Sequence, residues 1–250
     1  MIEHKDGLAW IATEADGPEH FYLVFGQGVT PRELAICLGA PEDSPVLDAA
    51  TIEAIDDALP PWGRNAPNIG RIGDAGNGWS FCLLPCTFVG AFGAESLPPE
   101  PTARLTRMID IDDTGMDPAN VGYSHDDTFV WGWFDGEPHE GGAQPDLFTD
   151  RLRALGLPPL PAGDEDPDEV IEAAYDRQYE LVYQVLSEHF GIGLPRDAVA
   201  GNTLPGMVCE PRELRYPVYA PAPDGRLQRT GTRTEPNPRW VDLRAHGFDM

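Results

Sequence analysis

The chain has 250 residues, of which 41% are hydrophobic, so it can bury a core without disulfide or metal support. Its 42 aspartates and glutamates against 17 lysines and arginines give a formal net charge of −25 at pH 7. Such a surface repels nucleic-acid phosphates and attracts cationic partners, so we expect a basic protein partner and no nucleic acid. Acidity that serves solubility alone, or a salt-loving source, explains the same charge.

The cysteines and the apolar pattern bear on cellular location. The four cysteines, at positions 37, 82, 86 and 209, follow neither a C-x-x-C pattern nor a disulfide framework, so we expect buried free thiols in a reducing compartment. No apolar run approaches the roughly 18 residues of a membrane span, and the N-terminus lacks the apolar segment of a signal peptide. We therefore expect a cytoplasmic protein without membrane contact and without a cofactor.

The N-terminal part predicts a strand followed by a capped helix. Trp10 and Ile11 are expected core anchors, and the aromatic and β-branched segment Phe21–Phe25 predicts a strand. In Thr30–Glu33, the threonine hydroxyl can accept a hydrogen bond from the backbone N–H of residue 33, and the Glu33 carboxylate can accept one from the backbone N–H of Thr30. Proline suits the first helical position, and Gly39 is expected to end this helix in the left-handed conformation.

A β-hairpin gives the strongest sheet signal. Asn77-Gly78 lies between two strand-like segments, Asn68–Ala75 and Trp79–Leu84. A two-residue type I′ turn needs positive φ at both central positions, which asparagine and glycine adopt most readily. A helix over Leu47–Leu59 is expected before the hairpin, because its apolar residues lie on one side and two prolines follow it.

A second hairpin is expected over Thr128–His139, with its turn at Asp135-Gly136. Its aromatic residues alternate and are expected on one face: Phe129, Trp131 and Trp133. A strand over Leu105–Ile111 and an acidic loop over Asp112–Asn120 come before it.

Helices dominate the next part of the chain. Helical spacing of apolar residues predicts helices over Pro145–Leu155, Asp166–Phe190 and Pro195–Ala200. The whole pattern predicts an α+β fold with a mostly antiparallel sheet of five or six strands. We expect the helices to pack on one face of this sheet, and a long C-terminal helix to close the body.

The composition changes after residue 204. Residues 205–250 contain 7 arginines and 6 acidic residues, whereas residues 1–204 carry a net charge of −26. We therefore predict an acidic α+β domain over residues 1–204 and a tail rich in proline and arginine after it. The tail is either flexible or draped on the acidic body, and the attraction of opposite charges favours the second alternative.

Several of these motifs together resemble an uncharacterised actinobacterial family, a domain of unknown function. The resemblance covers roughly residues 8–200 and depends on motifs spread along the chain: Trp10, Phe21–Phe25, Gly28–Leu34, Ile69–Gly73, Gly78-Trp79, Phe129–Trp131, Pro145–Leu147 and Phe190–Ile192. The chain departs from the family pattern at the insertion Leu47–Pro61 and at Pro85–Thr87. The resemblance implies an α+β domain in a bacterial cytoplasm and no assigned activity.

Two motifs look like ligand loops. Gly70, Gly73 and Gly76 have the spacing of a phosphate loop, but they lie inside a hairpin and not between a strand and a helix, so hairpin geometry is favoured. Asp110–Gly115 begins like a calcium loop, but Val121 occupies the position of the required glutamate. A solvated acidic loop is therefore the favoured interpretation.

The second hairpin carries the remaining candidates. His125 stands beside Asp126 and Asp127, so a metal or an acid–base pair can form there if these groups converge. Trp131, Trp133 and Phe134 are a candidate binding face, although an alternating aromatic strand is more often core. The candidate binding residues are Trp131, Trp133, Asp112, Asp113, His125, Asp126 and Asp127, and no residue is assigned to catalysis or to a metal.

The favoured hypothesis is a non-enzymatic interaction protein that binds a basic protein through its acidic surface, as immunity or antitoxin-like proteins do. One alternative is an enzyme with a carboxylate and histidine site near His125. Another alternative is a regulatory or scaffold module that acts through its C-terminal tail.

Overall fold

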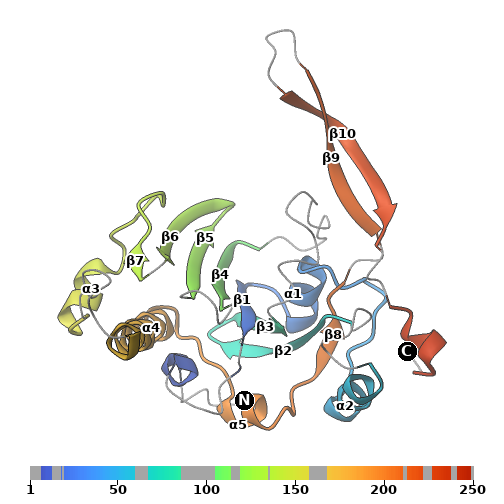
Figure 1. Ribbon diagram of the computed structural model, residues 1–250, viewed down its shortest axis with the longest axis horizontal. Helices are drawn as coiled ribbons and strands as arrows, with labels where there is room; N and C mark the ends of the chain where they lie inside the picture. The colour runs from blue at the N-terminus through green and yellow to red at the C-terminus, as the bar shows by residue number, and fades with distance from the viewer. Residues whose placement is uncertain are drawn as a thin grey trace.

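The fold is an eight-stranded antiparallel sheet with helices on both faces and a separate two-stranded hairpin (Figure 1). The structure is a computed structural model that describes residues 7–12, 18, 20–59, 67–85, 105–113, 119–134, 136–157, 168–210, 213–221, 227–237 and 241–248. The expected α+β class is confirmed. Among the described residues, no helix has both the length and the apolar character needed to cross a membrane.

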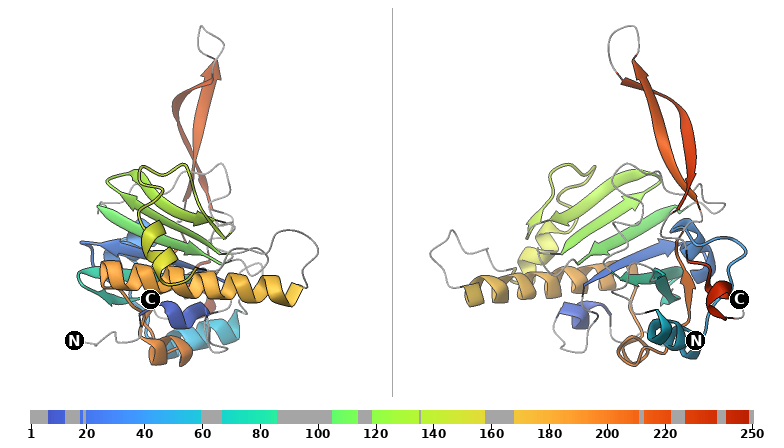
Figure 2. Two further views of the ribbon diagram at one scale, coloured as in Figure 1. Left: turned by 90° about the vertical axis from the view of Figure 1, so that its left-hand side faces the viewer. Right: turned by 45° about the vertical axis from the view of Figure 1, so that its right-hand side comes forward.

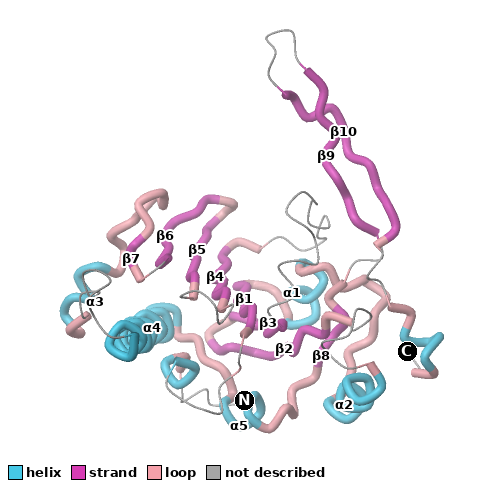
Figure 3. The backbone as a smooth tube through the Cα atoms, viewed as in Figure 1, coloured by secondary structure: helices cyan, strands magenta, loops and turns pink. Residues whose placement is uncertain are grey.

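The strands of the main sheet lie in the order β7-β6-β5-β4-β1-β3-β2-β8, which Figure 3 shows as one curved row. Their bounds are β1 Phe21–Gln27, β2 Ile69–Gly76, β3 Trp79–Pro85, β4 Arg107–Asp112, β5 Asn120–His125, β6 Thr128–Phe134, β7 Glu137–Pro138 and β8 Gly206–Val208. The expectation of five or six strands is wrong. The two-residue β7 and the three-residue β8 are too short to show a period in the sequence, and β5 begins at the end of the expected acidic loop.

The first hairpin is confirmed. β2 and β3 pair as neighbours, and Asn77 and Gly78 both have positive φ, 51° and 77°. The Asn77 side chain also donates a hydrogen bond of 2.8 Å to the carbonyl oxygen of Phe190. The turn therefore closes the hairpin and also holds the end of helix α4 (Asp168–Phe190).

Helix α4 covers one face of the sheet together with the 3-10 helix η1 (Ala9–Ala12), as Figure 2 shows. The helices α3 (Thr149–Ala154) and α5 (Arg196–Ala200) lie on opposite sides of α4 in Figure 1. The expected anchors Trp10 and Ile11 are buried in the core beneath α4. α4 has 23 residues, but it is not C-terminal, because β8 and two further strands follow it.

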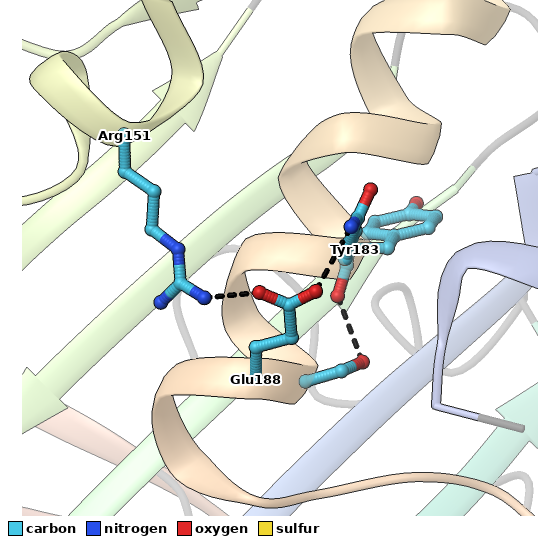
Figure 4. Close-up of polar contacts among 5 residues, drawn as sticks. Arg151, Tyr183 and Glu188 are labelled. Atoms are coloured by element: carbon cyan, nitrogen blue, oxygen red, sulfur yellow. Dashed lines mark hydrogen bonds and ion pairs between the residues drawn. The ribbon is translucent and has the colours of Figure 1, made fainter. Parts of the chain in front are cut away.

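A set of polar contacts ties α3 to the end of α4 (Figure 4). Arg151 pairs with Glu188, and Glu188 also accepts a hydrogen bond of 2.9 Å from the side chain of Gln184. The Ser187 hydroxyl donates to the Tyr183 carbonyl at 2.8 Å within the same helix. The Arg151–Glu188 pair is partly exposed, so it orients the two helices without burying charge.

The opposite face of the sheet carries helix α1 (Pro31–Cys37), so the expectation that helices pack on one face only is wrong. The expected capping box is confirmed: the Thr30 hydroxyl accepts from the Glu33 backbone at 3.2 Å, and Thr30 N donates to the Glu33 carboxylate at 2.7 Å. Leu34, Ala35 and Ile36 of α1 pack on this face of the sheet. Strand side chains alternate between the faces, and apolar residues on both faces of β1 demand cover on both.

Helix α2 (Ala49–Ala58) lies beside β8 at one end of the sheet and forms a smaller core with it. It confirms the helix expected over Leu47–Leu59, and the Asp48 side chain caps it by accepting from Thr51 N at 2.8 Å. Leu47 exchanges two backbone hydrogen bonds with Gly206 of β8, so this edge of the sheet is covered.

Residues after position 204 belong to several elements. β8 lies in the main sheet, and Val241 and Leu243, at the 3-10 helix η3 (Leu243–His246), pack with α2. Between them, β9 (Glu213–Pro221) and β10 (Leu227–Pro236) form a hairpin that projects from the body in all views (Figures 1 and 2). The division of the chain at residue 204, and the mobility of the part after it, remain predictions.

Several expected features lie partly or wholly outside the described residues. They are Cys86, Thr114-Gly115 of the calcium-like motif, Asp135 of the second turn and most of the linker after Leu157. The other cysteines, Cys37, Cys82 and Cys209, form no disulfide bond.

Candidate functional site

The turn between β5 and β6 presents two aspartates to solvent. Asp126 and Asp127 both have positive φ, 47° and 60°, as a two-residue type I′ turn requires. Aspartate tolerates this conformation better than most residues, because its short polar side chain can hydrogen-bond locally. The exposed His125 imidazole lies 3.5 Å from the Asp126 carboxylate. Three of the expected site residues are therefore brought together at an exposed turn.

A bulge in β6 moves Phe129 to the face opposite Trp131. Tyr123 pairs with Trp131, but the next residue of β5, Ser124, pairs with Phe129, so Val130 is the extra residue. A Cβ built on Gly132 would lie 2.6 Å from the ring of Phe129 and 3.1 Å from that of Phe134. Both rings thus lie over the glycine, and the expectation that Phe129, Trp131 and Trp133 share one face is wrong.

Phe129, Phe134 and His139 form a half-exposed aromatic cluster. The two phenylalanine rings stack at a centroid distance of 6.0 Å, and the His139 ring lies 4.7 Å from Phe134 and 5.7 Å from Phe129. Both phenylalanines are partly buried and His139 is exposed. Aromatic rings that remain partly in water on a rigid strand are typical anchors of a protein interface.

Exposed carboxylates surround this cluster. Asp126 and Asp127 lie at the turn that precedes Phe129, Glu137 pairs with Phe134 across β6 and β7, and Glu140 follows His139. We call these seven residues the acidic–aromatic patch: Asp126, Asp127, Phe129, Phe134, Glu137, His139 and Glu140. Carboxylates beside aromatic faces suit a lysine or arginine side chain, through ion pairing and cation–π attraction together.

Asp110 and Asp112 of β4 lie on the same face of the sheet as the patch. Burial, and then the Asp112 charge, raise the pKa of Asp110 to about 6. Burial, and then the Asp113 charge, also raise the pKa of Asp112 above its ordinary value. Burial next to both aspartates raises the pKa of the Tyr22 hydroxyl as well. The charges here are therefore poorly solvated and repel one another.

Glycines occupy the strand positions between Asp110 and the patch, so no side chain at these positions separates the carboxylate from the aromatic rings. Asp110 pairs with Gly122, and Gly122 pairs with Gly132 under the aromatic rings. A Cβ at Gly122 would lie 2.6 Å from the Asp110 carboxylate oxygen, so this carboxylate leans over the glycine toward the patch. One Asp112 oxygen is buried and accepts no hydrogen bond from the described residues. The carboxylate pair thus borders the patch along the sheet.

The histidine does not join this carboxylate pair. His125 pairs with Arg107 at the start of β4, whereas Asp112 ends that strand and pairs with Asn120. Five residues of strand separate the two places by roughly 16 Å. Within the described residues, no three histidine, cysteine or acidic side chains lie close enough to hold a metal ion. The described residues therefore place a carboxyl with a pKa of about 6 here, and they bring no histidine beside it.

The two tryptophans expected at a binding face are core residues. Trp131 and Trp133 are each 1% exposed and pack beneath α4. Phe148 contacts the Trp131 ring edge-on at 4.9 Å. Trp131 and Trp133 are therefore not available at a binding face, and the partly exposed aromatic residues of this strand are Phe129 and Phe134.

The two motifs that look like ligand loops have different surroundings. Asp113 is partly exposed at the end of β4 and donates its backbone N–H to the Phe21 carbonyl at 2.8 Å. The glycines of the phosphate-like motif lie in β2, where hairpin geometry accounts for them. Neither motif forms a ligand loop in the described residues.

A small pocket of about 190 Å³ lies on the α4 face near α5. It is lined by Pro18, Arg71, Leu83, Ala198, Val199, Ala200, Asn202 and Leu204. Arg71 donates to the Leu204 carbonyl at 2.9 Å and lies 3.9 Å from Asp56. Burial lowers the pKa of Arg71 and raises that of Asp56, so desolvation outweighs their attraction. The pocket is smaller than a typical ligand site.

No protein-family model matches the chain, no curated protein is similar to it, and no solved structure matches its fold. The resemblance to an actinobacterial family therefore stays a prediction.

Proposed function

We propose that the protein is a non-enzymatic interaction protein whose acidic–aromatic patch binds a basic segment of a protein partner. The observation that carries this proposal is the half-exposed cluster of Phe129, Phe134 and His139 within a border of exposed carboxylates. Interfaces derive most of their affinity from a few aromatic anchors, while charges around them attract and orient the partner.

The electrostatics of the chain support a cationic partner. With a net charge of −25, the protein attracts basic surfaces over a distance set by ionic strength, about 8 Å in physiological salt. The Asp110 and Asp112 carboxylates add a second reason, because a cation placed near them would relieve their mutual repulsion. An enzyme acting through His125 is less well supported, since the neighbouring Asp126 and Asp127 are exposed at a turn, and the partly buried Asp110 lies away from the histidine along the sheet.

The proposal is tested by capturing proteins from the native lysate on the immobilised chain, in low and in moderate salt. Four forms are compared: wild type, F134A, D126N/D127N, and the control E53Q/D57N, which removes two exposed charges on α2. Asparagine accepts the positive φ of the turn, so D126N/D127N keeps the backbone.

We expect one protein that carries a basic segment, either another protein or a further copy of this chain, to bind wild type and control equally, and to be lost with F134A, with D126N/D127N and with added salt. Capture of no such protein in low salt would contradict the proposal. Equal capture by all four forms would also contradict it, since the binding would then depend only on overall charge.

A further inference from the structure

The β9–β10 hairpin forms a two-stranded sheet of its own. Its strands pair over their whole length, from Leu227 with Pro221 to Pro236 with Glu213, and neither belongs to the main sheet. The hairpin projects beyond the body in every view (Figures 1 and 2). We call residues 213–236 the arm. A single two-stranded hairpin is only marginally stable in water, so an arm of this length needs a surface to lie against.

The exposed surface of the arm points to a protein contact. Residues 230–236 of β10 are exposed, and Val218 of β9 is one of two large hydrophobic side chains that the described residues leave strongly exposed. The guanidinium of Arg233 lies 5.1 Å from the centre of the Tyr216 ring. Arginine and tyrosine are both enriched in interface hot spots.

The arm has the opposite charge to the body. The two described strands of the arm, residues 213–221 and 227–236, contain three arginines and two glutamates, a net charge of +1, whereas residues 1–204 carry a net charge of −26. Because the arm projects away from its own body, the acidic surface it can reach belongs to another molecule. A nucleic acid is a poor occupant, since the body would repel its phosphates.

The contact has to be made by the faces of the arm and not by strand addition. In the body, Leu47 covers β8, and Ala143 and Gln144 donate to β6 carbonyls at 3.0 and 2.8 Å. In the arm, Pro217 and Pro221 of β9 have no N–H to offer to another strand. Side chains of the arm must therefore meet side chains of the body.

We infer that the basic segment bound by the acidic–aromatic patch is the arm of a second copy of this chain, and that two copies exchange arms in a symmetric dimer. The inference rests on the proposed function, because it uses the same patch. The patch provides carboxylates for the arginines and aromatic rings for Val218 and Tyr216. Strands of nine and ten residues make the arm about 30 Å long. A stable dimer requires the two exchanged arms to bury at least about 1,000 Å² in total.

Sedimentation velocity of the full chain tests the inference, with four forms compared at low salt. The arm variant R229E/R233E and the patch variant E137R/E140R each reverse charge on one side of the contact. The control R153E/R196E reverses two exposed arginines of the body. We expect wild type and control to form dimers, and each contact variant to dimerise at least tenfold more weakly. Added salt should also lower the dimer affinity of the wild-type chain.

Mixing the two contact variants provides the decisive measurement. The acidic arms of one variant then face the basic patch of the other, and the unchanged arms face the unchanged patch, so both contacts of a mixed dimer are complementary. We expect the mixture to recover dimerisation to within about threefold of wild type.

A monomeric wild-type chain at all concentrations would overturn the inference. So would a dimer that loses affinity with R229E/R233E but not with E137R/E140R, since the arms would then pair with each other. Capture of a different basic protein by a monomeric wild type, lost with D126N/D127N, would leave the proposed function standing and remove only this inference.

Discussion

The described residues cover the two faces of the sheet to very different extents. On the α4 face, a 23-residue helix lies over Trp79, Trp131 and Trp133, each 1% exposed. On the other face, the seven-residue α1 covers only the region around β1 to β3, and Asp110, Phe129 and Phe134 stay partly exposed. Strand β6 supplies aromatic residues to both faces. The difference shows that the covering helix, and not the residue type, decides whether an aromatic ring is core or available to a partner.

Truncating a tryptophan beneath α4 should have the largest effect on stability. Trp131→Ala leaves a large cavity in the core, and we expect it to lower the free energy of unfolding by about 3–5 kcal/mol. Phe134→Ala, in the same strand but half-exposed, should lower it by about 1 kcal/mol or less. Urea denaturation followed by tryptophan fluorescence measures both.

A conservative variant sharpens this comparison. The Trp131 indole N–H is buried and has no acceptor among the described residues. Trp131→Phe removes that donor and keeps an aromatic ring, so its loss should be less than half of the loss in Trp131→Ala. If the two variants lowered the free energy of unfolding equally, the tight packing around Trp131 on the α4 face would be contradicted.

Neutralising Asp110 should stabilise the protein at neutral pH. Its pKa is raised from about 4 to about 6 in the folded state, so ionisation opposes folding. The contribution of Asp110 to the free energy of unfolding is then highest below pH 4, falls as the pH rises from 4 to 6, and stays low above pH 6. We expect Asp110→Asn to raise the free energy of unfolding by about 1–2 kcal/mol at pH 7.5 and to leave it unchanged at pH 4. The gain is smaller than the full pKa shift implies, because Asp110 is partly exposed and solvent screens its charge.

Denaturation curves at several pH values provide the measurement for Asp110. Glu53→Gln, an exposed carboxylate on α2, is the matched control and should change stability little at any pH. A gain at pH 7.5 that persists unchanged at pH 4 would show that the charge of Asp110 is not the cause.

Removing the cap of α1 should have a smaller effect on the less covered face. Thr30→Ala loses the hydroxyl that accepts from Glu33 N, and we expect about 1 kcal/mol of destabilisation. Thr30→Ser keeps the acceptor and should stay within about 0.5 kcal/mol of wild type. Thermal unfolding by circular dichroism distinguishes the two, and a serine variant as weak as the alanine variant would contradict the capping role.

The smallest effect is expected at the contact between α3 and α4. Arg151 pairs with Glu188, but the side chains are 39% and 47% exposed, so solvent screens their attraction. Arg151→Ala should lower the free energy of unfolding by about 0.5 kcal/mol or less. Urea denaturation in low and high salt checks this, and a loss above about 1.5 kcal/mol would mean that α3 contributes more to the closure of the α4 face than its exposure suggests.

Much of the local structure follows from the sequence alone. The Asn77-Gly78 turn and the Thr30–Glu33 capping box are as expected, because each depends on residues within four positions of one another. The core anchors Trp10 and Ile11 were also predictable, since apolar residues of this size are seldom left in water. The acidity that motivates the proposed function is likewise a property of composition.

Only the tertiary structure decided which side chains share a face. The bulge at Val130 depends on pairing between β5 and β6, and no residue at that position signals it. The joining of β8 to the sheet depends on Gly206, which pairs with Arg71 of β2 and with Leu47, both more than 100 residues away. A strand of three residues has no period to detect, and its place is fixed by distant partners that close around it. The sequence by itself therefore determined the turns, the caps and the charge, while long-range pairing determined the sheet order and the composition of the acidic–aromatic patch.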